Sequence, residues 1–329
     1  MSGRAGHRRG FAIGRFSPPH AGHAYLIDTA RASVDALTVA VCERAGDPIP
    51  AGLRARWLRE AHPDVDVRVA AALPDDGPDA SAAYTRAFLG YVPDVVFSSE
   101  SGGDAYARAL GCAHVLVDAA RATVPVSAAR IRADPLAFLD RVAPPVRGYL
   151  ARRICAIGPE STGKTVLSGR LAVRFGAENV PEYGRDYTLR KLETPEPNVW
   201  NAAEFVHIAR EQQRREDEAA RRCNGLVVCD TDAFATEIWL ERYLGRQHVR
   251  GWPERDRPID LYLLTGPDVP FVADAIRDGE HLRAWMFDRF AEELTRRGLP
   301  FVVLRGTYAE RDAAAIEAVE SVMRAAKIG

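Results

Sequence analysis

The chain has 329 residues, of which 47% are hydrophobic and 27% are charged, and its formal net charge is −1. This length suggests about two domains with ordinary buried cores. The near-neutral charge excludes the strongly basic surface that is typical of proteins that bind nucleic acid or anionic membranes. No stretch approaches the ~18 apolar residues of a membrane span. We therefore expect small-molecule partners, and homo-oligomerisation stays open.

The basic segment 1–9 lacks the apolar stretch of a signal peptide. We expect it to be a disordered tail, and we expect the protein to be cytoplasmic.

The cysteines form no CxxC pair, so buried free thiols in a reducing compartment are favoured over a disulfide framework or a metal site. A site made of Cys223 and Cys229 is the weaker alternative. The five cysteines are Cys42, Cys112, Cys155, Cys223 and Cys229.

In the first half of the chain, short β-branched runs alternate with helical patterns. The predicted strands cover 11–16, 36–42, 65–70, 94–99 and 114–118. The predicted helices lie between them, at 21–33, 53–62, 80–91 and 102–110. Strands that alternate with helices indicate βαβ units and a mostly parallel sheet.

A second series of strands follows a break in this pattern. Two prolines interrupt the segment 143–153, and a new strand opens with RICAIG. The alternation therefore predicts an α/β protein with two doubly wound parallel-sheet domains, residues 10–147 and 148–329. We interpret the charge run 214–222 as a solvated helix face rather than a binding patch. The later predicted elements are strands at 224–230, 259–265 and 299–306 and a long amphipathic helix at 201–222.

The stretch GRFSPPHAGH, residues 14–23, lies where the first strand ends and the first helix begins. Gly14 permits close backbone approach, and Gly22 leaves room between His20 and His23. A helix N-terminus already favours anions through its free N–H groups and its dipole. Two imidazoles beside it make a compact donor set for a triphosphate. A lone histidine would more often be incidental, but this pair in this context predicts a phosphate site.

The stretch GPESTGKT, residues 158–165, satisfies the pattern GxxxxGK[ST] between a strand and a helix. The backbone N–H groups of such a loop cradle phosphates. Lys164 is expected to reach the β- and γ-phosphates, and Thr165 is expected to ligate Mg²⁺. The residues expected to contact ATP here are Gly158, Glu160, Ser161, Thr162, Gly163, Lys164 and Thr165.

Acidic residues downstream complete this second site. Asp230 ends the apolar run LVVCD and is predicted to hold Mg²⁺ together with Thr165. Asp232 follows it and is predicted to bind substrate. Glu182 and Arg185 are expected to face the acceptor, where Glu182 accepts the hydroxyl proton or holds a ribose hydroxyl. The alternative for these two is a surface ion pair.

The segment 266–283 is rich in turn residues and arginine. It predicts a mobile lid, with Arg277 or Arg283 closing over the transferring phosphate.

The first site resembles the nucleotidyltransferase superfamily, whose HxGH motif binds ATP phosphates. VSAARIRADP, residues 126–135, is similar to a second motif of that superfamily. The resemblance implies that Arg132 holds the β- and γ-phosphates and that Ser127 caps a helix and donates. Ala129 departs from the usual Thr or Ser, and Arg15 stands where a Lys is common. The residues implied to contact ATP are Gly14, Arg15, Phe16, Gly22 and Ser127, with His20, His23 and Arg132 as catalytic groups.

The chemistry implied for this domain is adenylyl transfer. A phosphate monoester attacks the α-phosphorus of ATP, and pyrophosphate leaves. Because the nucleophile is already an anion, catalysis needs positioning and charge stabilisation rather than a base. The histidines are expected to neutralise the charge that moves onto pyrophosphate, with help from Mg²⁺.

The order of the two sites resembles the bifunctional NadR family, in which nicotinamide mononucleotide adenylyltransferase is joined to ribosylnicotinamide kinase. The likeness covers nearly the whole chain from Gly10. It implies that the kinase makes nicotinamide mononucleotide from nicotinamide riboside and ATP, and that the other domain joins this product to AMP, giving NAD. The stretches that carry it are FSSE (97–100), VDAAR (117–121), PEYGRDY (181–187), IAREQQRRE (208–216), DTDAFATEIW (230–239) and PDVPFVADAIR (267–277).

Two departures and two alternatives qualify this likeness. Some members carry an N-terminal helix-turn-helix repressor domain, whereas here only residues 1–9 precede the first strand, so DNA binding is not expected. Ala273 and Ala275 replace polar or glycine positions of the lid. One alternative is a kinase and adenylyltransferase for another vitamin-derived nucleoside, because phosphate motifs do not recognise the base. The other is a sensor with one inactive half, which the intact phosphate motifs oppose.

Overall fold

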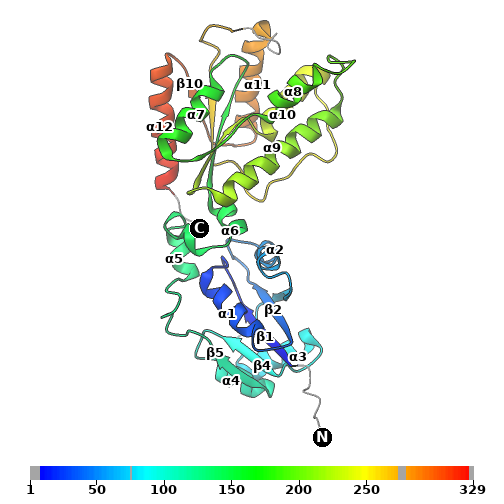
Figure 1. Ribbon diagram of the computed structural model, residues 1–329, viewed down its shortest axis with the longest axis vertical. Coiled ribbons are helices and arrows are strands. Elements are labelled where there is room, and N and C mark those ends of the chain that lie inside the picture. The colour runs from blue at the N-terminus through cyan, green and yellow to red at the C-terminus, as the bar shows by residue number, and fades with distance from the viewer. Residues whose placement is uncertain (1–7, 75, 273–278, 326–329) are drawn as a thin grey trace. The chain divides into compact units, whose positions relative to one another are not determined.

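The computed structural model describes residues 8–74, 76–272 and 279–325 (Figure 1). Within these residues the chain forms two compact units, and the boundary along the sequence falls between Val146 and Arg147. Each unit is an α/β domain with its own parallel sheet of five strands, as the alternation of strands and helices predicts.

The sheet of the first unit has the strand order β3-β2-β1-β4-β5, and all of its pairs are parallel. The chain order therefore reverses between β1 and β4, which is where open α/β sheets bind ligands. The elements are β1 (Arg9–Gly14), α1 (Ala21–Arg31), β2 (Ala36–Glu43), α2 (Ala51–Ala61), β3 (Asp66–Ala71), α3 (Pro78–Leu89), β4 (Val95–Ser98), α4 (Gly103–Leu110), β5 (Ala113–Leu116), α5 (Ala128–Ala133) and the 3₁₀ helix η1 (Leu136–Arg141).

Helices cover both faces of this sheet. Leu26 and Ile27 of α1 pack with α2 against one set of strand side chains, which includes Val39 and Phe97. Leu89 of α3 packs with α4 against the other set. Successive side chains of a strand point to opposite faces of the sheet. Strands that are buried on both faces therefore have continuous apolar runs in their sequence.

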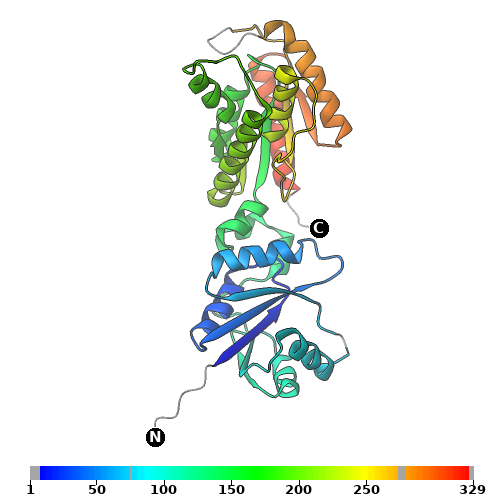
Figure 2. The same cartoon turned by 90° about the vertical axis from the view of Figure 1, so that its right-hand side faces the viewer.

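The second unit repeats this architecture of a sheet flanked by helices (Figure 2). Its strand order is β10-β9-β6-β8-β7, again all parallel. Helices α7 and α12 pack on one face of the sheet, and α9, α10 and α11 pack on the other. The elements are α6 (Pro144–Leu150), β6 (Arg152–Ile157), α7 (Lys164–Phe175), β7 (Glu178–Val180), α8 (Tyr183–Lys191), α9 (Ala202–Arg222), β8 (Leu226–Asp230), α10 (Ala233–Leu244), β9 (Leu261–Thr265), the 3₁₀ helix η2 (Glu280–Leu282), α11 (Arg283–Arg296), β10 (Phe301–Leu304) and α12 (Tyr308–Arg324).

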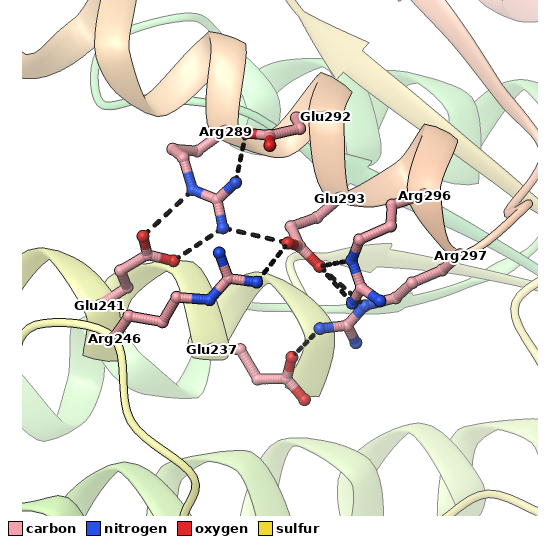
Figure 3. Close-up of polar contacts among 8 residues, drawn as sticks. All are labelled: Glu237, Glu241, Arg246, Arg289, Glu292, Glu293, Arg296 and Arg297. Carbon is pink, nitrogen blue, oxygen red and sulfur yellow. Dashed lines mark hydrogen bonds and ion pairs between the residues drawn. The ribbon is translucent and has the colours of Figure 1, made fainter.

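A cluster of ion pairs braces α10 against α11 (Figure 3). Glu241 of α10 accepts hydrogen bonds from Arg289 of α11 at 3.1 and 2.9 Å. The buried Glu293 accepts from Arg289, Arg296 and Arg297 of the same helical segment and pairs with Arg246, which follows α10. These contacts fix the side of α10 that faces α11.

The structure corrects two details of the sequence interpretation. Arg9, expected in the tail, is the first residue of β1. The run 214–222 is not wholly solvated, because Glu216 is fully buried beside Arg153 and accepts a hydrogen bond from Arg255. The helical period places Glu216 on the same buried face of α9 as Gln212 and Ala219, so it requires a buried cation as partner.

All five cysteines are free thiols, as expected. In the described part of the chain, no helix combines the length and the apolar character needed to cross a membrane.

Candidate active sites

The first unit has a cavity of about 570 Å³ where β1 and β4 end. The turn between β1 and α1, the residues after β4 and the segment before α5 all contribute to its wall. The structure brings together there every adenylyltransferase residue expected from the sequence: Gly14, Arg15, Phe16, His20, Gly22, His23, Ser127 and Arg132.

The two histidines lie directly against one another at the start of α1. Their rings stack with centroids 3.7 Å apart and an interplanar angle of 21°. His20 is the N-cap of α1, and its Nδ1 accepts a hydrogen bond from the Gly22 N–H at 3.1 Å. Because Nδ1 is the acceptor, the neutral ring carries its proton on Nε2. A Cβ at position 22 would lie 3.1 Å from the His20 ring, so glycine there keeps the turn open.

Both imidazoles are neutral in the free protein. Burial, together with the nearby charge of Arg121, lowers the pKa of His20 to about 4. Burial also lowers the pKa of His23 well below its usual value, with additional effects of His20 and Arg121. The expectation that these histidines neutralise charge on the leaving pyrophosphate stays a prediction. They act as neutral donors unless bound phosphate raises their pKa.

Arginines supply the positive charge of this cavity. Arg132 Nη1 donates to the carbonyl of Ser17 at 2.5 Å, which links α5 to the turn that carries the histidines. Ser127 is the N-cap of α5 and accepts from the Arg130 N–H at 3.3 Å. Arg15 is about half exposed and forms an ion pair with Asp47.

The sequence interpretation missed Arg121. It lines the cavity and lies close enough to both histidines to lower their pKa. Its backbone has a φ of +52°, in a turn closed by Asp118, whose carboxylate accepts N–H groups of residues 122, 123 and 124. The stretch VDAAR, which carries part of the family likeness, is the signal that could have pointed to it.

The second unit has a cavity of about 280 Å³ beside the P-loop. Its wall includes most of the kinase residues expected from the sequence: Glu160, Ser161, Thr162, Gly163, Lys164, Thr165, Glu182 and Arg185. Gly158 lies beneath the loop. A Cβ there would come within 2.5 Å of the Thr265 hydroxyl, and its φ is +142°, so only glycine fits.

Lys164 and Thr165 open α7 at the mouth of this cavity. The Lys164 Nζ is buried and donates to the carbonyl of Pro159, 2.8 Å away within the same loop. The Thr165 hydroxyl donates to Asp230 Oδ2 at 2.5 Å, and Asp230 ends β8. Hydroxyl and carboxylate oxygens are the hard ligands that Mg²⁺ prefers, so this pair fits the ion that the P-loop motif implies.

Asp232 and Arg283, like Gly158 and Asp230, lie outside the cavity wall. Asp232 is buried as the N-cap of α10, where it accepts from the Ala235 N–H and from the Tyr262 hydroxyl, each at 2.9 Å. The structure therefore does not support substrate contact by Asp232. Arg283 is buried and donates to the carbonyls of Val269 and Ser161, which makes it a brace for the backbone.

The predicted lid is only partly described. Arg277, Ala273 and Ala275 lie outside the described residues. Its two flanks both contact the P-loop. Ser161 Oγ donates to the carbonyl of Val272 at 2.8 Å, and the Gly279 N–H donates to Glu160 Oε2 at 3.0 Å.

A group of aromatic residues in the wall of this cavity, called here the aromatic wall, was not predicted. Trp200, Phe205, Trp239 and Tyr243 line the cavity. The Trp200 ring lies 5.2 Å from that of Phe205 and 5.3 Å from that of Tyr243, between centroids. The i, i+4 spacing of Trp239 and Tyr243 in the α10 pattern is a signal for a shared face, but it does not tell which cavity that face lines.

Comparisons with known proteins match both units. Residues 11–133 match a protein family described as "Cytidylyltransferase-like", and residues 153–311 match a family described as "AAA domain". The trifunctional NAD biosynthesis/regulator protein NadR of Salmonella typhimurium is 28% identical over 344 residues, which cover 95% of this chain and 83% of that protein. The chain is therefore similar to NadR over most of its length.

Solved structures show the same likeness in fold. A NadR protein in complex with NR superposes with a TM-score of 0.75 at 22% identity, covering 97% of this chain and 96% of that one. A NadR protein in complex with NAD and AMP-PNP gives 0.73 at 23%, covering 97% of both. The NadR architecture, a cytidylyltransferase-like domain followed by a P-loop domain, is therefore the fold of this chain.

Proposed function

We propose that this protein is a bifunctional transferase of NAD biosynthesis. Its second unit phosphorylates nicotinamide riboside with ATP, and its first unit transfers the adenylyl group of ATP to nicotinamide mononucleotide. The observation that carries this proposal is that one chain holds two separate cavities, one lined by the HxGH turn and the other by the P-loop, each at the carboxyl edge of its own sheet. The ligands named for the two solved NadR structures, NR and NAD with AMP-PNP, support it.

In the kinase reaction the riboside 5′-hydroxyl attacks the γ-phosphorus of ATP, and ADP leaves. Lys164 turns from the Pro159 carbonyl to the β- and γ-phosphates, where an ammonium stabilises the developing charge. Thr165 and Asp230 would hold Mg²⁺, which supplies further positive charge to the phosphates when bound. Glu182 lies in the cavity wall and accepts the hydroxyl proton, while Arg185 helps to orient the acceptor.

The aromatic wall suits the acceptor base. The pyridinium ring of nicotinamide riboside carries a positive charge, and the faces of tryptophan and tyrosine rings attract cations within about 6 Å. Trp200, Trp239 and Tyr243 line the cavity that also holds the P-loop. This observation favours nicotinamide riboside over a neutral vitamin-derived nucleoside.

In the adenylyl transfer the phosphate of nicotinamide mononucleotide attacks the α-phosphorus of ATP. The bond to the β-phosphate breaks, and pyrophosphate leaves. His20 can donate from Nε2, because its Nδ1 is held by Gly22. Arg15, Arg121 and Arg132 line the same cavity and offset the charge on the leaving group.

The proposal is tested by incubating the full-length protein with ATP, Mg²⁺ and nicotinamide riboside. Nicotinamide mononucleotide should form first and NAD second, because the product of the kinase is the nucleophile of the transferase. Chromatography with mass detection identifies both products. If the riboside is left unphosphorylated while another vitamin-derived nucleoside is consumed, the substrate assignment is wrong.

A further inference from the structure

A buried ion pair joins the P-loop to helix α10. Arg242 Nη1 donates to Glu160 Oε1 at 2.5 Å, and the two side chains are only 6% and 7% exposed. Glu160 belongs to the P-loop, and Arg242 lies in the last turn of α10. The second carboxylate oxygen of Glu160 accepts from the Gly279 N–H. The carboxylate of Glu160 thus holds three segments that are far apart in sequence.

The same guanidinium also contacts the aromatic wall of the kinase cavity. Its central carbon lies 5.1 Å from the centroid of the Trp239 ring and 5.0 Å from that of Tyr243. Both rings and Glu160 line the cavity. Arg242 is therefore in contact both with the loop that binds phosphate and with the wall assigned to the acceptor.

Two adjacent residues of α10, Glu241 and Arg242, bind different parts of the structure. Glu241 is held by Arg289 of α11 in the cluster shown in Figure 3, whereas Arg242 is held by Glu160. Successive residues of an α-helix are about 100° apart around its axis, since one turn holds 3.6 residues. The brace to α11 and the link to the P-loop are thus separate contacts, and each can be removed without the other.

Removing Arg242 would leave a carboxylate buried in the P-loop. A buried charge without its partner is costly, so Glu160 would move toward water or take up a proton. Either change would disturb the loop backbone next to Ser161 and Lys164. The shape of the P-loop thus depends on where α10 holds the guanidinium.

We propose that Arg242 is a positioning residue that couples acceptor binding to ATP binding in the kinase unit. An acceptor ring against Trp239 and Tyr243 holds the guanidinium against Glu160, and Glu160 then holds the P-loop in the form that receives phosphates. This inference rests on the proposed kinase function. Because coupling between two ligands is reciprocal, ATP also tightens acceptor binding by the same factor.

The coupling is measured by calorimetric titration of AMP-PNP and Mg²⁺ into the full-length protein, with and without saturating nicotinamide riboside. AMP-PNP can bind at both proposed ATP sites, so the part of the binding heat that disappears in Lys164→Ala is assigned to binding at the P-loop. In the wild-type protein the riboside should tighten this binding at least about fivefold, as typical couplings do. In Arg242→Met the factor should fall below about twofold. Glu241→Gln weakens the neighbouring brace and should keep the wild-type factor.

Three results would overturn the coupling role. The first is that the riboside does not tighten AMP-PNP binding in the wild-type protein. The second is that Arg242→Met shows the same tightening as the wild-type protein. The third is that Glu241→Gln loses as much of the tightening as Arg242→Met does. If the wild-type protein binds no riboside, the kinase function is contradicted as well. If it binds riboside but Arg242→Met leaves the tightening of AMP-PNP binding unchanged, only the coupling role is contradicted. If Arg242→Met does not fold, Arg242→Lys and Glu160→Gln carry the test, and each should lower the factor by at least about half.

Discussion

The rings of His20 and His23 stack at 3.7 Å between centroids, and burial together with Arg121 lowers the pKa of both. This arrangement makes the stability of the first unit depend on pH. Burial holds the pKa of His20 at about 4 in the folded state, against an ordinary value of 6.5. The folded protein therefore binds fewer protons than the unfolded chain, and stability is lost as pH falls from about 6.5 toward 4.

We expect the free energy of unfolding to fall by about 1–2 kcal/mol more in the wild-type protein than in His20→Asn between pH 6.5 and pH 5. Chemical denaturation at both pH values, in phosphate-free buffer, measures this difference. Asparagine suits the N-cap of α1 and cannot be protonated. Parallel pH profiles for the two proteins would show that His20 is not a buried neutral imidazole.

Asp230 is expected to act through its charge. Asp230→Asn keeps an oxygen that can accept from the Thr165 hydroxyl but removes the negative charge. Kinase kcat should fall by about 10²-fold or more, in line with loss of one preorganised electrostatic group, and the Mg²⁺ concentration for half-maximal rate should rise. Steady-state assays across a Mg²⁺ series provide the measurement. An unchanged Mg²⁺ dependence would remove Asp230 from the metal site.

Glu182 distinguishes proton transfer from simple ion pairing. If it accepts the proton of the 5′-hydroxyl, Glu182→Gln should lower kinase kcat by about 10²–10⁴-fold. The variant keeps the shape of the side chain, so the KM for the riboside should change little. A kcat within threefold of wild type would reduce Glu182 to a partner of Arg185.

Asp232 should behave as a structural cap rather than as a substrate ligand. Asp232→Ala removes the acceptor for the Ala235 N–H and for the Tyr262 hydroxyl, which should cost about 1–3 kcal/mol of stability. The KM for the riboside should stay within about twofold in the remaining folded protein. Thermal melting and steady-state kinetics on one preparation test both parts. A tenfold rise in KM at full stability would return Asp232 to the substrate site.

Most of the fold follows from local pattern. The apolar runs of β2, β6 and β8 are short, bounded by turns and separated by amphipathic helices, which leaves a parallel sheet as the arrangement that buries them. The phosphate sites were also predictable, because a P-loop or an HxGH turn encodes its geometry within ten residues. These motifs depend on glycines such as Gly158 and Gly22, whose role is visible in the sequence.

Long-range contacts were not predictable in this way. The position of Asp232 is decided by Tyr262, thirty residues further along the chain, which donates to it from β9. The sequence pattern predicts that Glu216 is a solvated charge, and only the structure shows that Arg255 lies beside it. The pairing of Arg242 with Glu160 depends on how α10 packs near the P-loop, and no local pattern specifies that contact.

The most direct test of two independent transfer sites is a crossed assay of Lys164→Ala and His23→Ala. Each purified variant is assayed for phosphorylation of nicotinamide riboside and, separately, for NAD formation from supplied nicotinamide mononucleotide. Lys164→Ala should lower kinase kcat by at least about 10²-fold and leave adenylyl transfer near wild type. His23→Ala should do the reverse. A folded variant that loses both activities together, or a Lys164→Ala kinase within fivefold of wild type, would contradict the account.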